Sequence, residues 1–102
     1  MALDQIQLDL NNPVFQKGLF ELQKTEQSAV LRALKKLSQM SWKQIYEDKG
    51  LHWEQIHSLH GKQGEKLYTF RISRAFRAVA YREENWMRIL SLNPDHDSAY
   101  VS

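Results

Sequence analysis

The arginines of this chain are concentrated in one stretch. Five of the six fall within eighteen residues, at Arg71, Arg74, Arg77, Arg82 and Arg88. A guanidinium group is always charged, and its planar fork of donors suits bidentate bonding to phosphate oxygens. Residues 62–92 carry a net charge of +4, whereas residues 1–61 are neutral overall. This asymmetry predicts a protein that binds or processes phosphodiesters, although arginines that merely solvate an exposed sheet face would give the same pattern.

Groups suited to proton transfer flank the arginine-rich stretch. Glu54 precedes it, and His96 and Tyr100 follow it. Cleavage of RNA needs a base for the 2′-hydroxyl proton, cations for the charge on the phosphorane, and an acid for the leaving oxygen. A glutamate, the arginines and a histidine are the right types for these three roles. Each also has a structural alternative: Glu54 as a solvated carboxylate beside a lysine, and His96 as a capping or packing residue.

Other reaction types find less support. His57 and His60 would share one face of a helix, but no carboxylate or third histidine falls at matching spacing for a metal. The chain has no cysteine, which excludes disulfides and thiolate chemistry. Neither a nucleophile-elbow serine motif nor a glycine-rich phosphate loop occurs. We therefore expect acid–base chemistry with no metal and no cofactor.

Size and composition predict one folded domain over residues 1–102. The chain has 42% hydrophobic and 11% aromatic residues, which is typical of a folded protein. A chain of this length builds one modest core. No apolar run approaches the ~20 residues of a membrane span, and the N-terminus does not resemble a secretion signal. We expect a soluble, cytoplasmic protein.

Three segments in the second half alternate like β-strands. They cover residues 67–73, 76–81 and 86–92, with short turns at 73–75 and 83–85 that predict antiparallel neighbours. Because successive strand residues point to opposite faces, Arg71 leaves the sheet opposite to Phe70 and Ile72. The sheet is thus predicted to have one apolar face and one arginine-bearing face.

The first half reads mainly as helix. Residues 5–10 alternate and predict a short strand, after which Asn12-Pro13 starts a helix and residues 25–27 interrupt it. A second helix carries an apolar stripe from Ala29 to Met40. Ser41 is expected to cap a further short helix, and residues 51–59 fit neither helix nor strand clearly.

These elements predict an α+β fold. The N-terminal strand and the αα-hairpin pack on the apolar face of a small antiparallel sheet. The arginine-bearing face then stays open as a concave surface.

The chain resembles the RelE/ParE superfamily of toxins from bacterial type II toxin–antitoxin systems, especially its RelE, YoeB and HigB-like ribonuclease branches. The resemblance lies in residues 50–56, 68–81 and 89–100. Its most specific part is the spacing of Arg71, Arg77 and Tyr81, followed by the terminal His96 and Tyr100. The helical hairpin and the order of elements match more loosely and cover the rest of the chain.

The resemblance implies an mRNA interferase that enters the ribosomal A site and cuts mRNA by attack of a 2′-hydroxyl on the adjacent phosphate. Glu54 would be the general base, Arg77 the phosphate stabiliser, His96 the general acid and Tyr100 a base-stacking or positioning residue. The expected RNA-binding residues are Arg71, Arg74, Lys62, Lys66 and His57.

The resemblance also implies two partners and leaves two alternatives open. The partners are a cognate antitoxin and mRNA on the ribosome. One alternative is a ParE-like inhibitor of DNA gyrase, although such proteins generally lack the acid–base set. The other is a catalytically silent protein of the same fold that binds RNA or an antitoxin.

Overall fold

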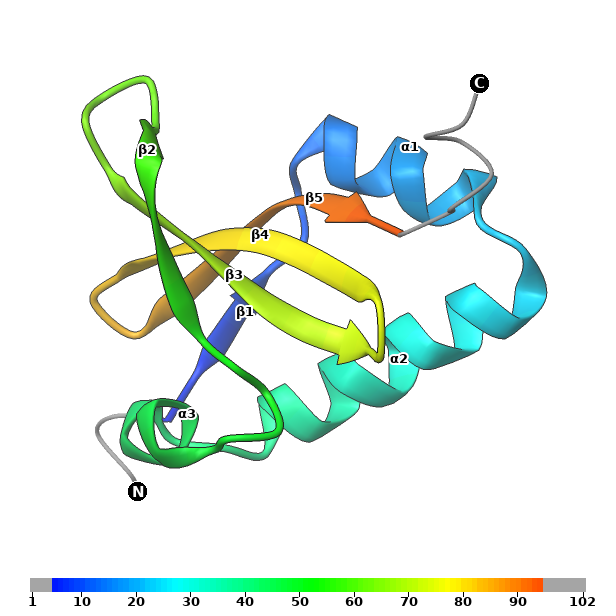
Figure 1. Cartoon of the computed structure of the whole chain (residues 1–102), viewed down its shortest axis with the longest axis horizontal. Helices are drawn as coiled ribbons and strands as arrows, with labels where there is room; N and C mark the ends of the chain where they lie inside the picture. The colour runs from blue at the N-terminus through cyan, green and yellow to red at the C-terminus, as the bar shows by residue number, and fades with distance from the viewer. Residues whose placement is uncertain (1–4, 95–102) are drawn as a thin grey trace.

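The computed structural model describes residues 5–94 as a five-stranded mixed sheet with three helices (Figure 1). The fold is therefore α+β, as predicted. The elements in chain order are β1 (Gln7–Asp9), α1 (Pro13–Glu21), α2 (Lys24–Ser38), α3 (Trp42–Glu47), β2 (Glu54–His60), β3 (Lys66–Ser73), β4 (Phe76–Glu83) and β5 (Trp86–Asn93).

The strands lie in the order β1-β5-β4-β3-β2. The pairs β2·β3, β3·β4 and β4·β5 are antiparallel, and two-residue turns at 74–75 and 84–85 join the last two pairs, as the sequence predicted. The N-terminal strand was expected to pack on a face of an antiparallel sheet, and this is wrong: β1 is an edge strand of the sheet and runs parallel to β5, with Leu8 opposite Met87. The connection from β1 to β5 is long enough for parallel pairing, since it contains the three helices and strands β2 to β4.

Local capping determines where the helices begin. The Asn12 side chain accepts a hydrogen bond from Val14 N at 2.8 Å, and Pro13 occupies the first helical position. Ser41 caps α3 as expected. The predicted interruption at residues 25–27 is wrong: these residues form the first turn of α2, because Glu26 closes a capping box with Gln23.

One face of the sheet forms the core with the helices. Phe70, Ala78 and Ile89 are at most 1% exposed there, and Val30 and Leu37 of α2 pack against them. Figure 1 shows α1 beside the end of β5 and α2 running along the sheet. The helical hairpin therefore covers the apolar face, as predicted, and no element within residues 5–94 packs as a layer on the opposite face.

Two segments differ from the sequence expectation. The first strand is shorter than residues 5–10. The ambiguous segment 51–59 contains most of β2, a mostly exposed edge strand whose weak hydrophobic alternation explains the ambiguity. His57 and His60 consequently lie on a strand and do not share a helical face. Across residues 5–94, no helix is both long and apolar enough to cross a membrane.

Candidate functional site: the arginine-bearing face of the sheet

Two arginines face each other on the open side of the sheet. Arg71 on β3 is directly opposite Arg77 on β4, and the neighbouring pair is Thr69 with Val79. Residues paired in this way have Cα atoms about 4.5–5.5 Å apart and share one face. Asn93 on β5 extends the row beyond Arg77. The sequence placed both arginines on the face away from the core, and the register confirms this.

The guanidinium groups of this pair have unused donors. Across residues 5–94, the buried side-chain nitrogens without a hydrogen-bond partner are Arg71 Nε, Arg77 Nη1 and Trp53 Nε1. Like charges directly across a sheet repel each other, and a buried donor without an acceptor is costly. An oxyanion bound at the accessible part of the pair would offset the repulsion, because phosphate oxygens accept guanidinium donors with charge assistance. The pair is therefore a candidate phosphate site.

Glu54 lies on the same face as the arginine pair. Glu54 was predicted to precede the sheet, but it is the first residue of β2 and pairs with Thr69 on β3. This register makes Arg71 its diagonal neighbour, at a Cα separation of about 7–8 Å. Among the described residues no ion pair joins Glu54 to Arg71 or Arg77. The carboxylate is thus near the candidate phosphate site but not neutralised by it.

The Glu54 carboxylate contacts the imidazole of His52, a residue for which the sequence predicted no role. His52 Nε2 lies 2.5 Å from Glu54 Oε2, and both side chains are about half exposed or more. The backbone of His52 is left-handed, with φ of 56°, a conformation that is uncommon for residues other than glycine. The spacing of His52 and Glu54, two residues apart, was the one signal in the sequence that pointed to this contact.

The pocket next to this dyad has a different electrostatic character. It measures about 420 Å³, and Glu47 and Asp48 contribute to its lining together with His52 and Glu54. Lys49 also lines this pocket and Lys36 pairs with Asp48, so the charges there are mixed. An anionic substrate is therefore expected to approach Glu54 from the side of Arg71 and Arg77, where both charged side chains are cationic.

Arg82 does not belong to the candidate site. Its guanidinium lies 4.5 Å from the centroid of the Trp42 ring, and it donates to Tyr46 Oη at 2.8 Å and to the Glu84 carbonyl at 2.6 Å. These contacts tie α3 to the β4–β5 turn. The expectation that Arg82 contributes to an anion-binding face is therefore wrong, because its register places it on the side of α3.

Arg88 is on the open face but is already paired. It bonds Asp9 Oδ2 at 2.6 Å and Glu83 Oε1 at 2.7 Å. The backbone N–H of Asn11 and then Arg88 hold the pKa of Asp9 below its ordinary value. Within residues 5–94 the face is thus polarised: no ion pair involves Arg71 or Arg77 at one end, whereas the charge of Arg88 is compensated at the other.

The remaining basic residues are divided between the two ends of β3. Arg74 is exposed in the β3–β4 turn, close to the arginine pair. Lys62 and Lys66 are exposed around the β2–β3 connection, at the opposite end of a strand that spans about 23 Å, and His57 is exposed within β2, three residues after Glu54. Lys62 and Lys66 are therefore separated from Arg77 along the sheet, and the assignment of all three residues to RNA binding stays a prediction.

Tyr81 is a further polar residue of the open face. It lies on β4, four residues after Arg77, and pairs with Arg88. Burial, followed by the charges of Glu65 and Glu83, raises the pKa of its phenol. The hydroxyl therefore stays protonated at neutral pH and can act as a donor.

Two candidate catalytic residues, His96 and Tyr100, lie outside the described residues. Within residues 5–94, no group of three or more histidine, cysteine, aspartate or glutamate side chains is arranged to hold a metal ion.

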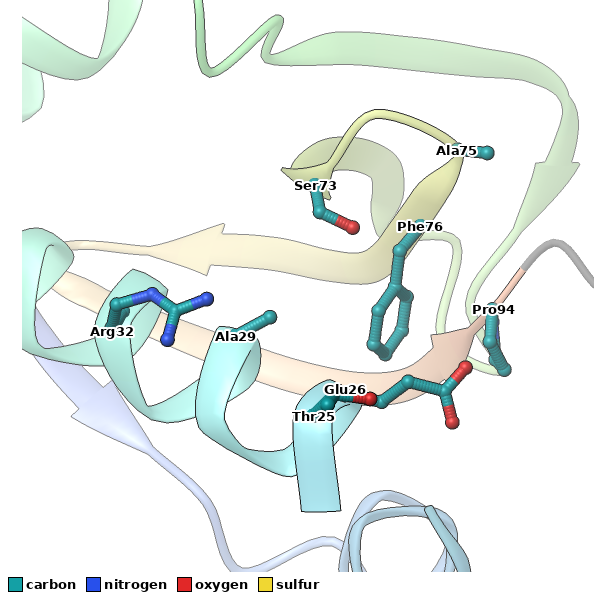
Figure 2. A pocket seen from close by; sticks show the side chains of 8 residues that line it. All are labelled: Thr25, Glu26, Ala29, Arg32, Ser73, Ala75, Phe76 and Pro94. Atoms are coloured by element: carbon teal, nitrogen blue, oxygen red, sulfur yellow. The ribbon is translucent and has the colours of Figure 1, made fainter. Parts of the chain in front are cut away.

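A second pocket, of about 320 Å³, lies between α2 and the β3–β4 turn. Figure 2 shows Arg32 and Glu26 projecting from α2, with the ring of Phe76 between them and Pro94 beyond. None of Glu54, Arg71 and Arg77 lines this pocket. It is therefore distinct from the candidate site.

The fold has a counterpart among solved structures. A chain in the crystal structure of the archaeal RelE–RelB complex from Pyrococcus horikoshii OT3 is similar, with a TM-score of 0.57 and 18% sequence identity. The match covers 91% of this chain and 96% of that chain. No family profile and no curated protein matches the sequence. At this identity the likeness shows the fold alone, so the chain has a RelE-like fold, as predicted.

Proposed function

We propose that this protein is the toxin of a toxin–antitoxin pair and cleaves mRNA as an endoribonuclease. The observation that carries the proposal is the opposed pair Arg71 and Arg77. Within residues 5–94 neither arginine has an ion-pair partner, and a carboxylate lies on the same face. A phosphodiester bound at the pair offsets the repulsion of the two guanidinium groups while a nearby base acts on the adjacent 2′-hydroxyl.

The proposed reaction is an intramolecular transesterification at the phosphate. Glu54 accepts the proton of the 2′-hydroxyl, and the 2′-oxygen attacks the adjacent phosphorus. Arg77 and Arg71 stabilise the charge that develops on the phosphoryl oxygens. His96 donates a proton to the departing 5′-oxygen, so the products are a 2′,3′-cyclic phosphate and a 5′-hydroxyl. Tyr100 stacks on a neighbouring base.

The other basic residues bind flanking nucleotides. Arg74 lies next to the arginine pair and contacts an adjacent phosphate. Lys62 and Lys66 are separated from Arg77 along the sheet, so they and His57 bind ribosomal RNA or another part of the message. Ribosome-bound mRNA is thus the proposed substrate.

An antitoxin is the proposed protein partner. The structural neighbour comes from a complex of RelE with RelB, which supports a partner of that kind. Its binding would cover part of the basic surface and so prevent access of RNA.

Inducible expression in bacteria tests the proposal. Wild type is compared with Arg77→Ala and His96→Ala, with growth and mRNA 5′ ends as readouts. Growth arrest with new 5′ ends inside codons, lost in both variants, is the expected result. Arrest without cuts would favour gyrase inhibition, and soluble protein without arrest would favour a silent RNA- or antitoxin-binding protein.

A further inference from the structure

The connection into β2 is held rigidly on both sides of His52. The Asp48 carboxylate accepts a hydrogen bond from Leu51 N at 2.9 Å, and Arg71 N donates to the Leu51 carbonyl at 2.7 Å. Leu51 itself is buried, and Glu54 enters the β2·β3 ladder. His52 is therefore fixed between an anchored residue and a paired strand.

His52 adopts an unfavourable backbone conformation in this connection. Its φ of 56° is left-handed, where the Cβ of an ordinary residue is crowded. Such strain persists only when the surroundings enforce it, and it clusters at functional sites. Glycine would fit this position without strain. Histidine is among the residue types that tolerate this conformation, and Glu84 adopts it as well, so the contact of the His52 side chain is what distinguishes this position.

The imidazole is directed at the Glu54 carboxylate. An ionised carboxylate only accepts hydrogen bonds, so Nε2 carries the proton and donates to Oε2 across 2.5 Å. Among residues 5–94 the carboxylate has no other ion pair, which leaves Oε1 to accept a proton from a substrate. The ring thus fixes one oxygen and the orientation of the other.

We propose that His52 is a positioning residue that holds the Glu54 carboxylate ready to accept the 2′-hydroxyl proton. This inference rests on the ribonuclease function proposed above. Glu54 is otherwise an exposed side chain at the edge of the sheet, free to adopt several rotamers. Restricting the carboxylate to one orientation is a recognised source of rate acceleration, since displacing a reacting group by ~1 Å can lower the reaction rate about 10²-fold.

Steady-state cleavage of ribosome-bound mRNA by the purified full chain tests the proposal. His52→Ala is expected to lower kcat by about 10–100-fold with KM within about twofold, because the residue acts on the base and not on substrate binding. His52→Asn is expected to retain a larger fraction of the wild-type kcat than His52→Ala, since asparagine tolerates the left-handed backbone and its side-chain amide can donate a hydrogen bond to Glu54. The exposed His60 on β2 provides the control, and His60→Ala cleaves like wild type.

His52→Gly separates positioning from folding. It relieves the backbone strain, so its melting temperature is expected to be no lower than that of wild type while its kcat falls as in His52→Ala. Nitrogen-15 NMR of the neutral ring provides an independent readout. The proton should reside on Nε2 in wild type and distribute over both nitrogens in Glu54→Gln.

The outcomes distinguish the two proposals. If wild type cleaves RNA and His52→Ala cleaves equally well, the positioning role is refuted and the ribonuclease function stands. If His52→Gly is fully active, the ring is likewise dispensable. If wild type does not cleave at all, the ribonuclease function fails, and the role of His52 in catalysis fails with it.

Discussion

Arg71 and Arg77 stand directly opposite each other on β3 and β4, each with a buried guanidinium nitrogen that bonds to nothing among residues 5–94. Cross-strand pairs of like charge destabilise a sheet. By contrast, Arg88 on the same face is compensated by Asp9 and Glu83. Within residues 5–94, the difference between the compensated Arg88 and the pair without counter-charges is the main electrostatic feature of this surface.

Removing one arginine of the pair should leave the fold intact. Arg77→Ala is expected to change the free energy of unfolding by no more than about 1 kcal/mol in either direction, because relief of repulsion offsets lost packing of the side-chain stem. Urea denaturation measures this. A loss of several kcal/mol would show that Arg77 is structural and would refute its assignment to a phosphate site.

The pair should also respond to a simple anion. Inorganic phosphate is expected to raise the melting temperature of wild type, since a ligand that binds only the folded state stabilises it. The increase should be smaller in Arg71→Ala and Arg77→Ala. Chloride at matched ionic strength is the control, and an equal response to both salts would mean that phosphate acts by screening alone.

Arg82, unlike Arg77, is expected to stabilise the fold. Arg82→Ala removes a cation–π contact with Trp42 and two hydrogen bonds, and is expected to lower the free energy of unfolding by about 1–2 kcal/mol. Arg74→Ala, in the exposed β3–β4 turn, is the matched control and should cost less than about 0.5 kcal/mol. Equal costs for both would contradict a structural role of Arg82.

The hydrogen bonds that Asp9 accepts from the Asn11 N–H and from Arg88 predict a pH dependence of stability. The folded-state pKa of Asp9 lies below the ordinary value of 3.8. A lowered pKa contributes stability that is present above 3.8 and is lost as pH falls through the folded value. Asp9→Asn should therefore be less stable than wild type at pH 7, with the difference shrinking below pH 3.8. A difference in the free energy of unfolding between wild type and Asp9→Asn that stays the same at all pH values would argue against this linkage.

Packing of the hairpin on the sheet can be tested at α2. Leu34 is 8% exposed and belongs to the core, so Leu34→Ala is expected to cost about 2–5 kcal/mol. Leu31 lies on the same helix and is 60% exposed, so Leu31→Ala should cost less than about half a kcal/mol. Chemical denaturation of both variants provides the comparison, and similar costs would refute the observed packing.

Several local elements and the orientation of their faces could be predicted from the sequence, although β2 and the start of α2 could not. Helix caps at Asn12 and Ser41, the apolar stripe of α2 and the turns of the last three strands all follow from interactions over a few residues. Alternation along β3 and β4 was likewise sufficient to place Arg71 and Arg77 away from the core. Such patterns are readable because their physical cause is local.

Which side chains contact one another depends on the tertiary structure and could not be predicted from local patterns. Asp9 neutralises Arg88 across 79 residues, and β1 pairs in parallel with β5, neither of which a local pattern encodes. The contact of His52 with Glu54 required the turn that precedes β2. Strand pairing and register depend on long-range packing, and these contacts separate the arginines that share a function from those that stabilise the fold.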